Sequence, residues 1–204
     1  MGVWGLQHIF DKGSKEITLL LLHGTGGTEH DLIGLAREID AEANILSVRG
    51  QVLENGMPRF FKRLAEGVFD MEDLRLRTDE LKQFIDNAAS KYGFNREKVI
   101  AIGYSNGANI AANLLFRHKG SLLGAILHHP MVPDREANIP SLQGIHVWAG
   151  AGTNDVMCPP QETEELKALL EDAGANVSVD WFNFGHQLTM VEVMAAKNWY
   201  KSLF

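Results

Sequence analysis

Short apolar runs recur along the chain, and the stretches between them have a different, helical periodicity. Most of the runs are continuously apolar, which is the pattern of strands buried on both faces of a parallel sheet. The strands predicted in this way are Ile17–Leu22, Ile45–Val48, Val99–Ile102, Leu122–Leu127, Ile145–Trp148 and Val177–Phe182. A weaker run, Leu6–Phe10, predicts an additional edge strand.

Between the runs, apolar residues repeat with the spacing of amphipathic helices. The spacing i, i+3, i+4, i+7 is clearest in residues 32–39, 81–88 and 166–173. Alternating strands and helices predict an α/β fold, with a mostly parallel sheet of about seven strands, helices on both faces and no separate lid. Because no repeat or linker interrupts the pattern, we expect residues 1–204 to form a single domain.

The composition is that of an ordinary globular protein. Hydrophobic residues make up 45% and charged residues 22% of the 204 positions. The longest wholly apolar run, Leu19–Leu22, is too short to cross a bilayer, and the first residues lack the pattern of a signal peptide. The single cysteine, Cys158, has no internal disulfide partner, so we expect a cytoplasmic protein.

The net charge argues against two classes of partner. The 19 basic and 26 acidic side chains give a formal net charge of −7. A field of that sign repels nucleic acid and anionic lipid, so we expect no nucleic acid and no membrane as a partner. The sequence does not fix the oligomeric state, and a homodimer stays open.

One segment, Arg49–Asp70, departs from the alternation. It has weak periodicity and contains three glycines and one proline. Irregular stretches of this length inside compact domains are usually functional or mobile, so we favour a functional role. The alternative is a surface excursion with a short helix near residues 60–64. The basic residues Arg59, Lys62 and Arg63 are expected to face water, although one of them could meet a substrate carboxylate.

The sequence Gly-Tyr-Ser-Asn-Gly at residues 103–107 indicates a nucleophile. It follows a predicted strand and precedes a helical stretch, which is the context in which G-x-S-x-G forms a sharp turn that exposes the serine hydroxyl. We therefore predict Ser105 as a nucleophile. The alternative is a glycine-rich turn that only packs tightly.

A serine hydroxyl needs a base, and eight histidines are available. His186 follows the last predicted strand, and Gly185 before it permits a tight turn, so we predict His186 as the base. His128 and His129 end another strand and could border the site, but adjacent strand residues are expected to point to opposite faces.

The base in turn needs a carboxylate that orients it. Asp155 and Asp134 both follow predicted strands. We predict Asp155, because it lies closer to its strand end and the glycines before it suit a turn that directs the side chain inward. Asp134 is the rival.

Two backbone N–H groups are expected to bind the oxyanion. The serine turn supplies the N–H of Asn106, and the glycine-rich loop at residues 23–27 brings the N–H of Thr25 closest. This loop lacks the Lys-Ser/Thr of a phosphate loop and the third glycine of a dinucleotide fingerprint. Because zinc-ligand spacing is also missing, we expect no metal and no organic cofactor.

Four ordered motifs, LLLLHGTGG, GYSNG, GTND and FGHQL, together resemble the small carboxylesterase/phospholipase branch of the α/β-hydrolases, which includes acyl-protein thioesterases. The resemblance covers nearly the whole chain. It implies Ser105, Asp155 and His186 as the catalytic triad, with Thr25 and Asn106 as backbone oxyanion donors. The segment RGQVLENGMPRFF also resembles a loop that helps to wall the acyl pocket in relatives.

We therefore predict a serine carboxylesterase that hydrolyses small carboxylic esters, or thioesters, through an acyl-enzyme. The alternatives are a long-chain lysophospholipase or acyl thioesterase, a carbon–carbon bond hydrolase or peptidase, and a non-catalytic binding protein. The missing lid weakens the case for long acyl chains. Candidates for an apolar acyl wall, each of which would also suit the core, are Met57, Phe60, Phe61 and Met157.

Overall fold

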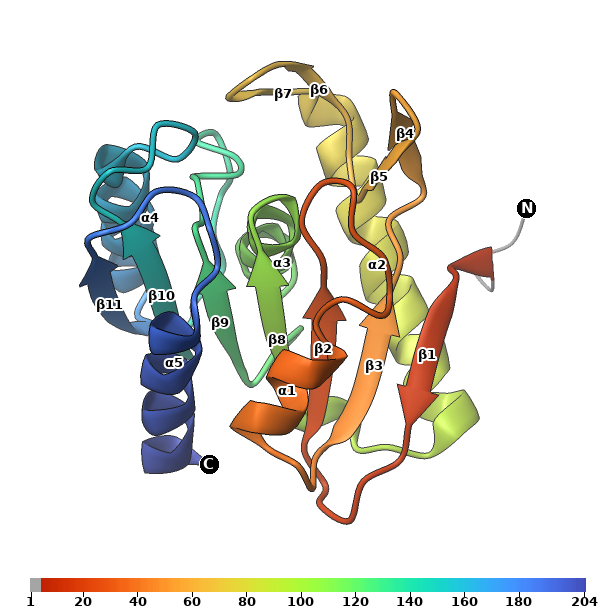
Figure 1. The fold of residues 1–204 in the computed structure, drawn as a ribbon. Coiled ribbons are helices and arrows are strands. Elements are labelled where there is room, and N and C mark those ends of the chain that lie inside the picture. The colour runs from red at the N-terminus through yellow and green to blue at the C-terminus, as the bar shows by residue number, and fades with distance from the viewer. Residues whose placement is uncertain (1–4) are drawn as a thin grey trace.

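A seven-stranded sheet forms the centre of the computed structural model, which describes residues 5–204 (Figure 1). In spatial order the strands are β1 (His8–Asp11), β3 (Asn44–Val48), β2 (Thr18–Leu22), β8 (Val99–Tyr104), β9 (Gly124–His128), β10 (His146–Gly152) and β11 (Asn176–Phe182). Only β1 runs antiparallel to its neighbour, and every other pair in this sheet is parallel. The predicted mostly parallel α/β fold is confirmed.

Helices cover both faces of the sheet (Figure 1). On one face lie α1 (Ile33–Ile39) and α5 (Met190–Leu203). On the other lie α2 (Met71–Tyr92), α3 (Asn106–Arg117) and α4 (Pro160–Asp172), and a short 3-10 helix, η2 (Arg96–Lys98), precedes β8. Helix α2 is longer than its predicted part. Asp70 caps its start by accepting a hydrogen bond from the Asp73 N–H. Gly93, which has a φ of 69°, ends the helix.

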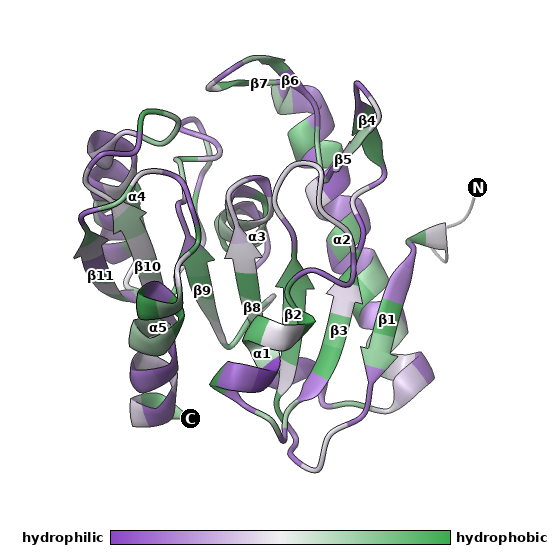
Figure 2. Cartoon of the chain, viewed as in Figure 1, coloured by the Kyte–Doolittle hydropathy of each residue, from purple (hydrophilic) through white to green (hydrophobic). Residues whose placement is uncertain are grey.

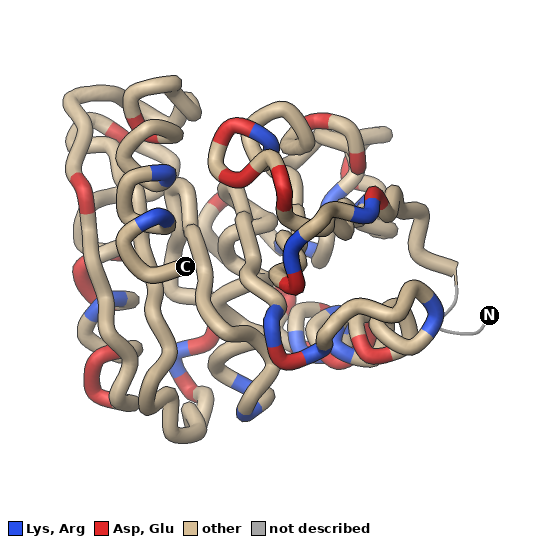
Figure 3. Tube along the Cα trace, turned by 90° about the horizontal axis from the view of Figure 1, so that it is seen from below, with Lys and Arg blue, Asp and Glu red and all other residues tan. Residues whose placement is uncertain are grey.

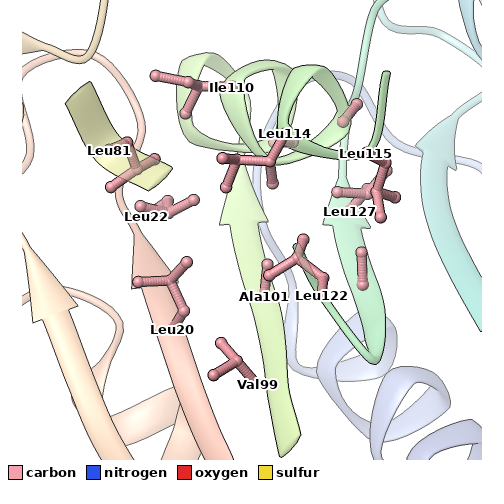
Figure 4. Close-up of a cluster of buried hydrophobic side chains, with 14 of the residues drawn as sticks. Leu20, Leu22, Leu81, Val99, Ala101, Ile110, Leu114, Leu115, Leu122 and Leu127 are labelled. Carbon is pink, nitrogen blue, oxygen red and sulfur yellow. The ribbon is translucent and has the colours of Figure 1, made fainter. Parts of the chain in front are cut away.

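Each strand contributes to two hydrophobic cores, since successive side chains point to opposite faces. Leu19 and Leu21 pack with α1 and α5, whereas Leu20 and Leu22 pack with α2 and α3. Figure 4 shows the second core, in which Leu114 and Leu115 of α3 lie over the sheet. Colouring by hydropathy shows apolar residues concentrated in the central strands, whereas the helices combine apolar and polar residues (Figure 2).

The segment between β3 and α2 folds into two hairpins at the carboxyl end of the sheet (Figure 1). The first pairs β4 (Val52–Glu54) with β5 (Met57–Arg59), and the second pairs β6 (Arg63–Ala65) with β7 (Val68–Phe69). Asn55 and Gly56 form the first turn with φ values of 52° and 80°, as a two-residue hairpin loop requires. The alternative of a short helix near residues 60–64 is wrong.

Basic and acidic residues are interspersed along the chain (Figure 3). None of the helices within residues 5–204 combines the length and the apolar character needed to cross a membrane.

The close approach of α3 to β2 gives a stability test. A Cβ on Gly107 would lie 1.9 Å from the carbonyl oxygen of Leu22, so we expect Gly107→Ala to lower the free energy of unfolding by about 3 kcal/mol or more. Gly34 in α1 has open space around it, and Gly34→Ala should raise the free energy of unfolding by about 0.5–1 kcal/mol. Urea denaturation of both variants measures the contrast, and equal stabilities would contradict it.

Candidate active site

Ser105 lies at the sharp turn between β8 and α3. Its φ of 52° and ψ of −115° are unusual for a residue with a side chain. The flanking glycines make the turn possible, because a Cβ on Gly103 would lie 2.5 Å from the carbonyl oxygen of Gly107. The Ser105 N–H donates to the His128 carbonyl at 2.9 Å, which ties the turn to β9.

A chain of hydrogen bonds joins Ser105 to two other residues at the carboxyl end of the sheet. The Ser105 hydroxyl donates to Nε2 of His186 at 2.8 Å, and Nδ1–H of His186 donates to Oδ2 of Asp155 at 2.7 Å. The Tyr104 hydroxyl donates to the backbone carbonyl of His186 at 2.7 Å and so holds its loop. The structure therefore brings together the three residues that the sequence predicts as nucleophile, base and acid.

The Asp155 carboxylate is buried and fully hydrogen-bonded. Its Oδ1 accepts the N–H groups of Met157 and Cys158, both at 2.9 Å, and its Oδ2 also accepts Nδ1–H of His129 at 2.9 Å. Burial alone would raise the pKa of Asp155, but the Cys158 N–H and the His186 imidazole outweigh it and lower that pKa. The rival carboxylate, Asp134, instead binds Arg75.

A cavity of about 310 Å³ opens beside Ser105 and His186. Met57 and Met157, two of the four residues predicted to form an apolar wall, line it. The other two, Phe60 and Phe61, do not line this cavity, because both side chains are buried in the core that includes α2 and α3. The remaining lining comes from the hairpins and strand ends: Thr25, Arg59, Arg63, Glu66, Gly67, Phe69, Tyr104, Asn106, Asn109, Met131 and Cys158.

The predicted oxyanion donors border the same cavity. Thr25 and Asn106 both line it, and neither of their N–H groups has an acceptor within residues 5–204. The first hairpin fastens both segments, since the Gly26 N–H donates to the Pro58 carbonyl at 2.9 Å and the Phe60 N–H donates to Oδ1 of Asn106 at 2.7 Å.

Arg59 is buried, so the prediction that it faces water is wrong. Its side chain is only 4% exposed, and Nη1 donates to Oγ1 of Thr25 at 2.6 Å while Nε donates to the Phe61 carbonyl at 3.2 Å. Burial, and next the charge of Arg63, lower the pKa of Arg59. Arg63 is half-buried against Glu54, and Lys62 alone of the three basic residues is exposed.

Comparisons with known proteins show the family of the chain. The family described as Phospholipase/Carboxylesterase matches residues 8–203. The chain belongs to this family. It is 60% identical over 196 residues to the Bacillus subtilis (strain 168) protein MhqD, a match that covers 96% of this chain and 98% of that protein.

Solved structures of the family resemble the fold closely. The crystal structure of the Bacillus cereus carboxylesterase is 59% identical, has a TM-score of 0.97 and matches over 98% of this chain and 95% of that one. The structure of YahD with malic acid is 38% identical, with a TM-score of 0.92 over 98% of this chain and 100% of that one.

A buried histidine–glutamate network lies behind Asp155, and sequence reasoning missed it. His129 Nε2 lies 3.2 Å from Oε2 of Glu192, whose other oxygen accepts Nδ1–H of His128. Both histidines contact one carboxylate, so the expectation that they point to opposite faces is wrong. The reason is the φ of 52° at His129, which ends the alternation of the strand.

The partners of His129 determine its protonation state. Its two ring nitrogens face carboxylate oxygens of Asp155 and Glu192, which only accept hydrogen bonds, so both nitrogens carry hydrogen and the ring is an imidazolium. Burial alone would lower the pKa of His129, but the hydrogen bond and charge of Glu192, and then Asp155, raise it. The bonds from His128 and His129 overcome the burial of Glu192 and lower its pKa to about 2.

Three of these side chains also have the donor types of a metal site. The nearest ligand atoms of His129, Asp155 and His186 lie within 4.8 Å of one another. Nδ1–H of each imidazole, however, donates a hydrogen bond to Oδ2 of Asp155, so hydrogen bonds already join the three side chains.

The network gives a prediction for stability. Glu192→Gln leaves His129 with a charge that is only partly compensated, and we expect a loss of about 3–5 kcal/mol near pH 7. Because the pKa of Glu192 is lowered on folding, its contribution is present above about pH 4.5 and declines as pH falls toward 2. Urea denaturation from pH 7 to pH 3.5 should therefore show the difference from the wild type shrinking.

A surface carboxylate supplies the control for this measurement. Glu165 forms an exposed ion pair with Arg135, and Glu165→Gln should cost less than about 1 kcal/mol. A loss for Glu192→Gln as small as that for Glu165→Gln would contradict the proposed charge pair.

Proposed function

We propose that the protein is a serine carboxylesterase that hydrolyses small carboxylic esters, or thioesters, through an acyl-enzyme. The main support is the unbroken chain of hydrogen bonds from Ser105 through His186 to Asp155, at 2.8 and 2.7 Å, beside a cavity. The carboxylesterase named in the Bacillus cereus structure, at 59% identity, adds to it.

In the proposed mechanism His186 removes the hydroxyl proton of Ser105 as the oxygen attacks the acyl carbonyl. Asp155 keeps Nδ1–H of His186 in place, so that Nε2 carries the lone pair that accepts the proton. The N–H groups of Thr25 and Asn106 stabilise the tetrahedral oxyanion. His186 then gives the proton to the leaving alcohol or thiol, and a water activated by the same imidazole releases the acid.

The size of the cavity favours small acyl groups over the long-chain alternative. Its volume of about 310 Å³ is at the lower end of the range for ligand pockets. Met57 of the first hairpin and Phe69 of the second close it on one side. A non-catalytic binding protein is less well supported, because ligand binding alone does not require Ser105, His186 and Asp155 to be hydrogen-bonded in this order.

The reaction is proposed to take place in the cytoplasm, on small-molecule esters and without nucleic acid or membrane. The side chains and backbone groups of the proposed mechanism all come from one chain. A homodimer is compatible with this arrangement but is not needed for it.

Replacement of the nucleophile is the most direct test. Ser105→Ala should lower kcat for a short ester by a factor of about 10⁶, because within residues 5–204 no other hydroxyl donates to Nε2 of His186. Labelling by a fluorophosphonate should also disappear, while circular dichroism stays unchanged. More than a few per cent of wild-type activity in Ser105→Ala would refute the assignment.

The acid is tested by two matched amides. Asp155→Asn should lower kcat by about 10⁴, because an amide cannot hold the required histidine tautomer. Asp134→Asn removes a carboxylate that binds Arg75 and should leave kcat within about tenfold of wild type, after correction for any unfolded fraction. Steady-state kinetics on one ester decide between them, and the opposite ranking would make Asp134 the acid.

Acyl chain length tests the size of the pocket. Esters with acyl groups of about two to six carbons should have higher kcat/KM than those with twelve or more, because the cavity is small and bounded by the hairpins. A series of 4-nitrophenyl esters measures the dependence. A rate that rises steadily to long chains would favour the lysophospholipase or thioesterase alternative.

A further inference from the structure

Two guanidinium groups lie in the wall of the cavity that contains Ser105. Arg59 and Arg63 both line it. Within residues 5–204, Glu54 is the single carboxylate that forms an ion pair with either of them. Glu66 also lines the cavity, but it is exposed to water. The buried part of this wall therefore carries more positive than negative charge.

Glu54 is more strongly engaged by Arg63 than by Arg59. Arg63 binds both oxygens of Glu54 through Nε at 3.0 Å and adds a bond from Nη2 at 2.7 Å. Arg59 approaches that carboxylate through its Nε, at 3.3 Å and without a hydrogen bond, and this N–H already donates to the Phe61 carbonyl. The charge of Arg59 is thus the less compensated of the two.

The hydrogen-bond donors of Arg59 lead to the same conclusion. A guanidinium has five N–H groups, and the structure gives acceptors to Nε and to one N–H of Nη1. No residue within 5–204 accepts from Nη2. Nη2 is not one of the fully buried atoms without a partner, so a ligand in the cavity can reach it, and a planar pair of N–H groups matches the two oxygens of a carboxylate.

We propose that Arg59 binds a carboxylate on the acyl part of the substrate, so that the enzyme acts on half-esters of short dicarboxylic acids. This inference rests on the proposed esterase function. Arg59 bonds to Thr25, on the oxyanion side of Ser105, whereas the leaving alcohol departs toward His186. Water cleaves the acyl carbon–oxygen bond, and the products are the alcohol, the dicarboxylate and one proton released to the solvent.

Arg59 also has a structural contact that the test must separate from substrate binding. Its bond to Thr25 supports the proposed oxyanion loop, and loss of that support would slow every ester equally. Loss of carboxylate recognition by Arg59, in contrast, slows only the charged ester. A ratio of two rates on matched substrates distinguishes the two effects.

The experiment compares ethyl hydrogen succinate with ethyl 4-methylpentanoate, in which an isopropyl group replaces the carboxylate. The wild type should prefer the charged ester in kcat/KM, and Arg59→Met should reduce that preference by about 10- to 100-fold. Arg59→Lys, which keeps the charge but loses the planar pair of donors, should give an intermediate value. Lys62→Met, an exposed neighbour outside the cavity, should keep the wild-type ratio.

Binding of free succinate, measured by calorimetry, supplies a readout that does not depend on turnover. The wild type should bind it, and Arg59→Met should weaken binding at least about tenfold. If neither ester is hydrolysed but succinate binding depends on Arg59, the proposed esterase function fails and the carboxylate site stands.

Three results would overturn the inference while leaving the esterase intact. One is a wild type that hydrolyses both esters without preferring the charged one. Another is an Arg59→Met variant that melts at the wild-type temperature and loses the same factor on both esters. The third is a charge preference in the wrong part of the ester. In 3-acetoxypropanoate the carboxylate lies on the alcohol part, and a preference seen only for this ester over 3-methylbutyl acetate would show that the site binds a charged alcohol part.

Discussion

The carboxylate of Asp155 is the group on which the arrangement of the site depends. It lies among buried residues at the end of β10, and four donors from three different segments converge on its two oxygens. Two backbone N–H groups fix the loop that carries it, and two imidazoles fix its direction. These hydrogen bonds lower the pKa of the buried Asp155 carboxylate, so that it keeps its charge, and one of them fixes the direction of the His186 ring.

Backbone strain is concentrated where this network meets the serine turn. Ser105 and His129 both have a φ of 52°, and the Ser105 N–H donates to the carbonyl of His128, directly before His129. Such conformations cost about 1–3 kcal/mol each and persist only where the surroundings enforce them. Here close glycine contacts enforce the first, and two buried carboxylates bind the side chain of the second.

The periodicity of the sequence predicted the sheet well, because buried parallel strands need continuous apolar runs. Ser105, Asp155 and His186 could be predicted because each of them follows the end of a predicted strand. It did not predict the hairpins, although Asn55-Gly56 is a recognisable turn signal, since the strands on either side are only three residues long. The burial of Arg59 depends on Thr25, which is distant in sequence, and no local pattern reports such a contact. The environment of His129 likewise depends on Glu192 in α5.

The first hairpin is held to the scaffold through its main chain, by the Pro58 carbonyl and the Phe60 N–H. These two attachments do not depend on which side chains the hairpin carries. Mutations at outward positions such as Met57 can therefore reshape the entrance while the proposed oxyanion loop and the serine turn keep their supports. Substitutions in the hairpin can therefore change the substrate preference with little effect on folding. When variants are designed, this hairpin is the segment in which to exchange sequences between relatives.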